Sequence, residues 1–313
     1  MTSKVCVLGS INMDVVVRVE RFPQAGETLT GLSCDLMPGG KGANQAIAIA
    51  NMGVPVDLIG AIGNDEFGKM LRAHLASFGV DIDCVTETES SSGTAIVTVN
   101  QRGDNQIVVI PGSNMLLQRE AIERYVGQRG SAIQYLVSQF ETPLDYIHYT
   151  FGKAKEYGAT TVLNPSPIQP IPRELVEHTD IFVLNKLELA QAVEITEAIS
   201  SPDEVAQAAL EWTRNIGNKI VIVTLGDKGL VAIQDGQVIK RTAEKVSCAV
   251  DTTGAGDCFC GSLVAFLHKG YSLDESLTLA QKAAAYSVQR KGASPSFPKL
   301  DTLNLNKMKG ETK

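Results

Sequence analysis

The sequence predicts an α/β fold, a doubly wound and mostly parallel sheet flanked by helices, with a small antiparallel β lid. Short apolar runs rich in β-branched residues alternate with amphipathic helical patterns along the 313 residues. Runs of this kind are typical of strands covered by helices on both faces of a parallel sheet. Turn-rich segments interrupt the alternation and account for the lid. We expect a single domain over residues 1–313.

The strands of the main sheet are expected at six apolar runs. They are Val5–Leu8, Val56–Ile59, Tyr135–Val137, Thr161–Leu163, Ile181–Leu184 and Lys219–Thr224. A hairpin of Leu230–Ile233 and Val238–Lys240 turns at Asp235-Gly236 and should extend one edge of this sheet.

The helices between the strands have recognisable ends. Asp65 precedes apolar residues at helical spacing and Gly79 follows them, which predicts a helix between the two. A second helix is expected between the proline at position 143 and the glycine at 158. Ser272 and Glu275 have the spacing of a capping box and predict the start of a third helix.

The lid is expected from about residues 14–38 and 92–111, where antiparallel strands with tight turns are predicted. Its strands should be Val15–Val19, Thr28–Leu32, Thr94–Asn100 and Gln106–Ile110, the last two joined by Arg102-Gly-Asp-Asn105. Apolar alternation in the lid also favours pairing with a second copy, so a homodimer through the lid is expected.

Composition excludes several classes of protein. A net charge of −7 and a pI near 5.2 argue against nucleic acid or an anionic membrane as a partner, which leaves small molecules. The six cysteines form no Cys-x-x-Cys pattern, so neither a zinc site nor a disulfide framework is predicted. The N-terminus does not resemble a signal peptide, and no apolar run approaches the ~18 residues of a membrane span. We expect a cytoplasmic protein.

A glycine-rich turn leads directly into a helical pattern near the C-terminal end. It reads Asp251-Thr-Thr-Gly-Ala-Gly-Asp257 and precedes an apolar-periodic run from Cys258 to Lys269. The first N–H groups of a helix lack partners and bind anions. A carboxylate there repels phosphate unless it takes a proton from a hydroxyl that attacks the phosphorus. The motif indicates phosphoryl transfer to an alcohol, although the same residues also suit a turn with a capping aspartate.

Two further segments establish a resemblance. Pro38-Gly-Gly-Lys-Gly-Ala-Asn44 lies upstream, and Ser10-Ile-Asn-Met-Asp14 follows the first predicted strand. With the glycine-rich turn, they resemble the ribokinase-like family of carbohydrate kinases, in the family's order from Val5 to Pro298.

The resemblance implies ATP-dependent phosphorylation of a sugar hydroxymethyl group, with O5 of D-ribose as the acceptor. Asp257 would be the general base, with an anion hole at Gly254, Ala255 and Gly256. Other acceptors in the same family are 2-deoxyribose, nucleosides and other sugars. A non-catalytic sugar sensor is an alternative from another class. A dinucleotide-binding oxidoreductase fits poorly, because the first strand is followed by Gly-Ser-Ile-Asn and not by Gly-x-Gly-x-x-Gly.

The resemblance also implies a sugar site of carboxylates, amides and one ammonium group. The matching residues are Asn12, Asp14, Gly40, Lys41, Asn44, Glu141 and Asp257. Such groups suit sugar hydroxyls, which both donate and accept hydrogen bonds. Taken singly, Asn12 and Asp14 also suit a turn, and Lys41 a solvated surface charge.

By the same resemblance, a second set of residues binds ATP and Mg²⁺. These residues are Asn185, Glu188, Thr224, Gly226, Gly256 and Gln281. Asn185 and Glu188 follow a predicted strand and would organise Mg²⁺ and the phosphates, although they also suit a helix cap. Lys186 departs from the glutamate common in ribokinase relatives and makes the local charge more positive.

The resemblance finally implies a K⁺ ion beside the anion hole. Its site would use Asp251, Thr253, Ser287, Arg290, Gly292 and Ser296. A bound cation would neutralise Asp251 and fix the loop. The segment from Arg290 onward also suits an ordinary helix C-terminus with basic residues.

Overall fold

A nine-stranded sheet forms the centre of the molecule. The structure is a computed structural model and describes residues 3–195, 199 and 201–303. The strand order is β13-β12-β11-β10-β9-β8-β1-β4-β5, parallel from β11 to β5 and antiparallel at β12 and β13. The strands are β1 Lys4–Leu8, β4 Val56–Gly63, β5 Val85–Thr88, β8 Ile133–Gln139, β9 Thr160–Asn164, β10 Ile181–Asn185, β11 Ile220–Thr224, β12 Leu230–Gln234 and β13 Gln237–Arg241. The six predicted strands and the edge hairpin are confirmed, whereas the edge strand β5 was not predicted.

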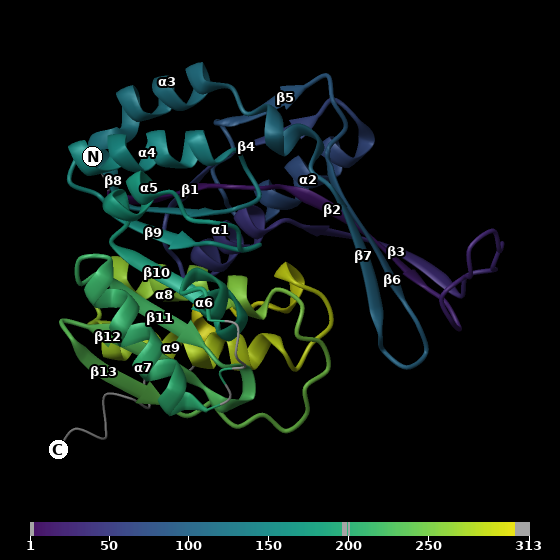
Figure 1. The fold of residues 1–313 in the computed structure, drawn as a ribbon. Helices are drawn as coiled ribbons and strands as arrows, with labels where there is room; N and C mark the ends of the chain where they lie inside the picture. Colours follow the sequence, from purple (N-terminus) through teal and green to yellow (C-terminus); the bar gives the residue numbers. More distant parts are fainter. Residues whose placement is uncertain (1–2, 196–198, 200, 304–313) are drawn as a thin grey trace.

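Helices cover both faces of this sheet, which confirms the doubly wound fold (Figure 1). They are α1 Lys41–Asn51, α2 Glu66–Ser77, α3 Arg119–Arg129, α4 Leu144–Glu156, α5 Arg173–His178, α6 Lys186–Ala192, α7 Pro202–Asn215, α8 Ala255–His268 and α9 Leu273–Ser287. Alternate residues of each strand face opposite layers: Val5 and Val7 pack with α1, α2, α8 and α9, whereas Cys6 and Leu8 pack with α3 to α7. No helix in the described ranges is long and apolar enough to cross a membrane.

The predicted helix ends are confirmed. The Asp65 side chain accepts a hydrogen bond from the backbone N–H of Gly68 at 2.7 Å and caps α2. Ser272 and Glu275 form a capping box at the start of α9. Pro143 directly precedes α4, which ends before Gly158.

The second sheet, which we call the lid sheet, projects from the body of the molecule (Figure 1). Its order is β3-β2-β6-β7, with β2 Asn12–Arg18, β3 Ser33–Gly39, β6 Gly93–Val99 and β7 Asn105–Ile110. The pairs β2–β3 and β6–β7 are antiparallel, as expected, but the central pair β2–β6 is parallel. The chain passes through α1, β4, α2 and β5 between β2 and β6, and such a long crossover permits parallel pairing.

The predicted strand Thr28–Leu32 is wrong. The partner of β2 is Ser33–Gly39, and residues 28–32 belong to the loop that precedes it. This strand ends in Pro38-Gly39, residues that are more typical of turns than of strands. Proline is tolerated here because β3 lies at the edge of the sheet, where Pro38 pairs with Met13.

Helix α1 touches its neighbours on two sides through glycine. A Cβ atom at Gly42 would lie 2.6 Å from the Cα atom of Gly9, at the end of β1. A Cβ atom at Gly261, in α8, would lie 2.5 Å from the carbonyl oxygen of Gln45. Neither contact leaves room for a side chain, so α1 is held directly against both backbones.

Candidate active site

A cleft of about 760 Å³ lies between the lid sheet and the body of the molecule. Its walls include strands β2, β6 and β7 of the lid sheet, the start of α1 and the loop that precedes α8. The seven expected sugar-binding residues all line it: Asn12, Asp14, Gly40, Lys41, Asn44, Glu141 and Asp257. The structure therefore brings together three sequence motifs that are far apart in the chain.

The start of α8 forms the floor of the cleft. Gly254 precedes the helix with φ at 72°, a left-handed conformation that favours glycine. The N–H of Ala255 donates to the carbonyl of Thr252 at 3.2 Å, so it is engaged within the turn. Gly256 and Asp257 are the next residues of the helix, and N–H groups at these positions lack an intrahelical acceptor. An anion placed here would meet these two groups first.

The Asp257 carboxylate is buried at this floor and held by two amides. Asn44 Nδ2 donates to Oδ2 at 3.0 Å, and Gln45 Nε2 donates to Oδ1 at 3.1 Å. Burial raises the pKa of Asp257, while Lys41 and the two amides act to lower it. Burial alone would lower the pKa of Lys41, but the carboxylates of Asp257 and Glu141 outweigh it and the pKa is raised. Lys41 is therefore a cation beside a buried base.

Glu141 and Asn12 are fixed by neighbours that the sequence did not single out for this role. Glu141 Oε2 accepts hydrogen bonds from the Ser10 hydroxyl at 2.5 Å and from the backbone N–H of Lys41 at 3.2 Å. Asn12 Oδ1 accepts one from Asn114 Nδ2 at 2.7 Å, and Asn114 Oδ1 accepts from the N–H of Ile11 at 2.9 Å. These contacts leave the amide group of Asn12 with a defined orientation.

Asp14 is the carboxylate of the lid sheet that enters the cleft. Burial raises its pKa to about 7, helped by repulsion from Glu141 and Asp257. Gly39 of the neighbouring strand β3, which pairs with Asn12, leaves room for this carboxylate, because a Cβ atom there would be 2.7 Å from Asp14 Oδ2. The carboxyl groups of Asp14, Glu141 and Asp257 thus lie close enough to repel one another, with the ammonium group of Lys41 near Glu141 and Asp257.

Two smaller pockets continue from the cleft and contain the expected nucleotide residues. One, of about 140 Å³, is lined by Lys41, Asn185, Glu188, Thr224 and Asp257, among others. The other, of about 290 Å³, is mainly apolar and lies between α8, α9 and the loop after β13. Thr224 lines both pockets, and Gly226, Gly256 and Gln281 line the apolar one. Gln281 Nε2 also donates to the carbonyl of Thr242 at 3.3 Å.

Asn185 and Glu188 form a capping box at the start of α6. Asn185 Oδ1 accepts from the N–H of Glu188 at 2.9 Å, and Glu188 Oε2 accepts from the N–H of Asn185 at 2.8 Å. The capping alternative is thus correct, and Glu188 still borders the 140 Å³ pocket with its buried carboxylate. Oxygen ligands of this kind suit Mg²⁺.

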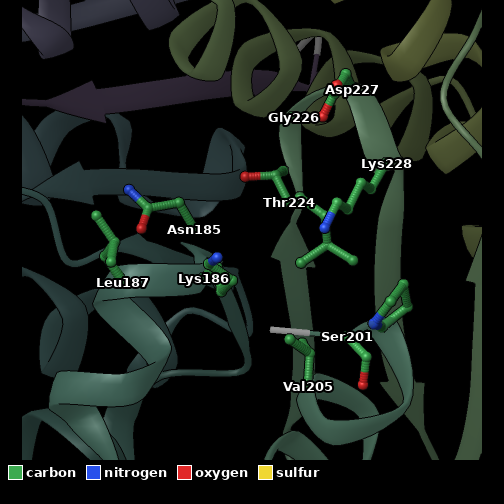
Figure 2. A pocket seen from close by; sticks show the side chains of 11 residues that line it. Asn185, Lys186, Leu187, Ser201, Val205, Thr224, Gly226, Asp227 and Lys228 are labelled. Atoms are coloured by element: carbon green, nitrogen blue, oxygen red, sulfur yellow. The ribbon is translucent and has the colours of Figure 1, made fainter. Parts of the chain in front are cut away.

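Lys186 does not line the pocket that contains Glu188. It borders a separate pocket of about 290 Å³, together with Thr224, Val205 and Lys228 (Figure 2). The positive charge of Lys186, which departs from the expected glutamate, therefore lies at the neighbouring pocket and not at the pocket of Glu188.

Among the residues expected for a K⁺ site, three are in contact. Asp251 Oδ1 accepts hydrogen bonds from the N–H and the hydroxyl of Thr253, and Oδ2 accepts one from the N–H of Gly292. Although burial acts against ionisation, these bonds lower the pKa of Asp251. The Ser287 carbonyl accepts from the N–H of Arg290 at 3.0 Å. The carboxylate of Asp251 and the carbonyl group of Ser287 offer oxygen atoms as ligands, which suit a hard cation.

Ser296 and Arg290 have other contacts in this structure. The buried Ser296 hydroxyl donates to the carbonyl of Ala293 at 2.7 Å. The Arg290 guanidinium donates to the carbonyl of Tyr286 at 2.9 Å and lies over its ring at 3.4 Å from the centroid. No hydrogen bond joins either side chain to Asp251 within the part of the chain that the structure describes.

Gln45 is a residue beside the proposed base that the sequence analysis did not single out. Its side chain is completely buried and contacts Asp257, and it immediately follows the motif that ends at Asn44. The signal that could have identified it is a glutamine among apolar residues in the segment after Asn44, because a buried amide needs partners.

Known proteins resemble this chain along nearly its whole length. The sequence profile of pfkB family carbohydrate kinases matches residues 2–300. Ribokinase of Staphylococcus aureus is 36% identical over 311 residues, covering 97% of this chain and 99% of that protein. Ribokinase of Haemophilus influenzae is 37% identical over 302 residues, covering 95% and 96%.

A relative named for a different sugar and a solved structure also match this chain along nearly its whole length. Deoxyribokinase of Salmonella typhimurium is 30% identical over 302 residues and covers 96% of this chain and 97% of its own. The structure of Arabidopsis thaliana ribokinase complexed with ribose and ATP superposes with a TM-score of 0.89 at 30% identity, covering 97% of this chain and 98% of that one.

Proposed function

This chain belongs to the pfkB family of carbohydrate kinases, and on that premise we propose that it transfers the γ-phosphoryl group of ATP to O5 of D-ribose, giving D-ribose 5-phosphate. The family transfers phosphate to a sugar hydroxyl. The observation that carries the proposal is the meeting of Asp257, Asn12, Asp14 and Lys41 in one cleft. Two ribokinases at 36% and 37% identity, and a ribokinase structure with ribose and ATP, support ribose as the acceptor.

In the proposed reaction Asp257 accepts the proton of the sugar hydroxyl as its oxygen attacks the γ-phosphorus. The O–H bond breaks, a new P–O bond forms, and the bond to the ADP oxygen breaks. In the Gly-Ala-Gly turn at Gly254, Ala255 and Gly256, the N–H of Ala255 is engaged by Thr252, so the N–H groups of Gly256 and Asp257 stabilise the negative charge, supported by the positive end of α8. Lys41 adds a positive charge at the 140 Å³ pocket, which Asp257 also lines.

We place ATP across the two smaller pockets, with its base in the apolar one and its phosphates in the one that contains Glu188. Thr224, Gly226 and Gln281 would contact the nucleoside part. Asn185 and Glu188 would hold Mg²⁺, which when bound neutralises charge on the phosphate oxygens. Asp251, Thr253 and the carbonyls of the loop after α9 would hold K⁺ and keep the loop before α8 in place.

A second candidate acceptor is 2-deoxyribose, which the deoxyribokinase relative at 30% identity favours. Release of ADP measured with ATP and a panel of ribose, 2-deoxyribose, hexoses and nucleosides separates the candidates. We expect the highest kcat/KM with ribose. A higher value with another acceptor would overturn the choice of sugar, and no ADP release with any of them would overturn the kinase activity itself.

We also propose a homodimer formed through the lid sheet. All six residues of β7 are exposed, and the side chains of Ile107, Val108 and Val109 are between 52% and 62% exposed. β7 is an edge strand, and an exposed apolar edge strand favours pairing. Sedimentation of the protein should show a dimer, and Val108→Lys should shift it toward the monomer.

A further inference from the structure

The amide group of Gln45 lies behind the Asp257 carboxylate, on the side away from the cleft. Gln45 Nε2 donates to Asp257 Oδ1 and to Asn164 Oδ1, both at 3.1 Å. Asn44, the preceding residue of α1, lines the cleft, whereas Gln45 is completely buried and lines none of the cleft and pockets described above. Gln45 therefore contacts the base without facing the sugar.

The surrounding amides leave this group only one orientation. Asn164 Nδ2 donates to the carbonyl of Val183 at 2.8 Å, so its Oδ1 is turned toward Gln45 and accepts. Behind it, Gln139 Nε2 donates to Gln45 Oε1 at 2.6 Å. A flipped Gln45 would place its carbonyl oxygen against the oxygens of Asp257 and Asn164, with no proton between them. Both N–H groups of Gln45 thus have fixed acceptors.

We propose that Gln45 is a positioning residue for phosphoryl transfer, which holds the Asp257 carboxylate in one orientation and in its ionised form. The inference rests on the proposed role of Asp257 as general base. A base must be ionised when the hydroxyl arrives, yet this carboxyl group is buried, and burial favours its neutral form. The N–H of Gln45 stabilises the ionised form of the carboxyl group more than the neutral form, because a hydrogen bond to a charged acceptor is stronger, and more so in a buried site.

The carboxylate is held at both oxygens from one helix. Asn44 binds Oδ2 from the side of the cleft and Gln45 binds Oδ1 from the interior, through consecutive residues of α1. Two fixed contacts on different oxygens restrict rotation of the carboxylate about its last bond. Loss of the contact from Gln45 should therefore change both the charge and the direction of the base.

The test is the pH dependence of kcat/KM in Gln45→Met, which keeps the length of the side chain and removes both donors. The acidic limb should move to higher pH, because the ionised form of Asp257 loses a hydrogen bond. We expect kcat/KM at about pH 6 to fall roughly 10-fold or more, with the value at about pH 8.5 within ~3-fold of wild type. The KM for the sugar should change little, since Gln45 does not line the cleft.

Gln45→Glu provides a second variant of nearly the same shape. Once ionised, its carboxylate cannot donate to Asp257 Oδ1 and places a like charge beside it, which disfavours the ionised form of Asp257 and moves the acidic limb further to higher pH. An acidic limb at the wild-type pH in a folded variant overturns the inference. A fall by the same factor at every pH also overturns it, because loosened packing alone gives that result.

Ser138→Ala is the matched control. Ser138 is equally buried, in the neighbouring strand β8, and its hydroxyl donates to the carbonyl of Leu8 at 2.8 Å, away from Asp257. It should lower the melting temperature without moving the acidic limb. Asp257→Asn is measured in parallel: if it stays active, the proposed general base is wrong, whereas an inactive Asp257→Asn with an unmoved limb in the Gln45 variants overturns only the role of Gln45.

Discussion

Asp251 and Gly292 are 41 residues apart in the sequence and are joined by a hydrogen bond of 2.9 Å from the Gly292 N–H to Asp251 Oδ2. The other oxygen of Asp251 accepts from the N–H and hydroxyl of Thr253 at 2.9 and 2.6 Å. One carboxylate therefore fastens the loop before α8 to the loop after α9. The first of these loops leads straight into the turn whose N–H groups face the proposed phosphate.

This arrangement predicts activation by a monovalent cation. In a buffer without Na⁺ or K⁺ and with a bulky organic cation, activity should be low, and it should rise and saturate as KCl is added. The cation would fix the loop before the reaction starts, so the rise should appear in kcat. Asp251→Ala should abolish the rise. Equal activity in all salts would return residues 290–296 to a purely structural role.

Replacing the proposed base by its amide tests the chemistry most directly. Asp257→Asn keeps the shape of the side chain and removes the proton acceptor, so we expect kcat to fall by roughly 10²–10⁴-fold. Binding of ribose, measured by calorimetry, should change little, because six other residues of the set remain. A variant with more than half of the wild-type kcat would remove Asp257 from the catalytic role.

The choice between ribose and 2-deoxyribose should depend on Asp14. Loss of one paired hydroxyl leaves buried polar groups unsatisfied, at about 1–3 kcal/mol, which corresponds to roughly 5- to 150-fold in kcat/KM. Ribose should exceed 2-deoxyribose by that margin, and Asp14→Ala should remove most of the difference and most of the affinity. Nucleosides should be poorer still. Unchanged discrimination in Asp14→Ala would assign the selectivity to another residue.

Asp14 should also destabilise the sugar-free protein at high pH. Burial raises its pKa to about 7 in the folded protein, whereas the unfolded chain has the ordinary value of about 3.9. Its favourable contribution to stability is complete below pH ~4 and is lost as the pH rises through ~7, because between these values the unfolded chain has released the proton that the folded state still holds.

Asp14→Asn removes this dependence. Without sugar, we expect the variant to be more stable than wild type at about pH 8, on the order of 2–4 kcal/mol, and nearly equal at about pH 4. Scanning calorimetry at the two pH values measures the difference. The same gain at both values would show that ionisation of Asp14 is not its cause.

The sequence predicted the main sheet well because its strands are buried on both faces. Runs such as Ile181–Asn185 are apolar at nearly every position and have no competing interpretation. The strand Ser33–Gly39 was missed because six of its seven positions are exposed or only partly buried, and it ends in Pro-Gly. Its place is fixed by pairing with β2, and pairing between strands leaves little trace in composition.

The candidate sugar-binding residues that the sequence suggested lie in motifs and line one cleft, whereas the residues that support them were not foreseen. Asn44 and Asp257 occur in glycine-rich segments, so their types and positions were informative before the fold was known. Gln45 and Asn114 act through contacts with residues that lie 212 and 102 positions away in the chain. A buried amide in a helix or a short turn has no distinctive spacing. Its role becomes visible only when the helices are packed.

The glycine contacts of α1 divide the cleft into two parts with different mechanical properties. Because the glycine contacts bring the backbone of α1 directly against those of β1 and α8, the spacing between the backbones that carry Asn44, Gln45 and Asp257 is fixed without large side chains at these two points. Asn12 and Asp14 are carried by β2 of the lid sheet, which projects from the body. A swing of that sheet would move the side chains of Asn12 and Asp14 toward or away from Asp257. The hydrogen bonds of Asp257 with Asn44 and Gln45 would stay intact during this movement. The base would then be ready for proton transfer at all times, and only the binding of the sugar would require a movement of the protein.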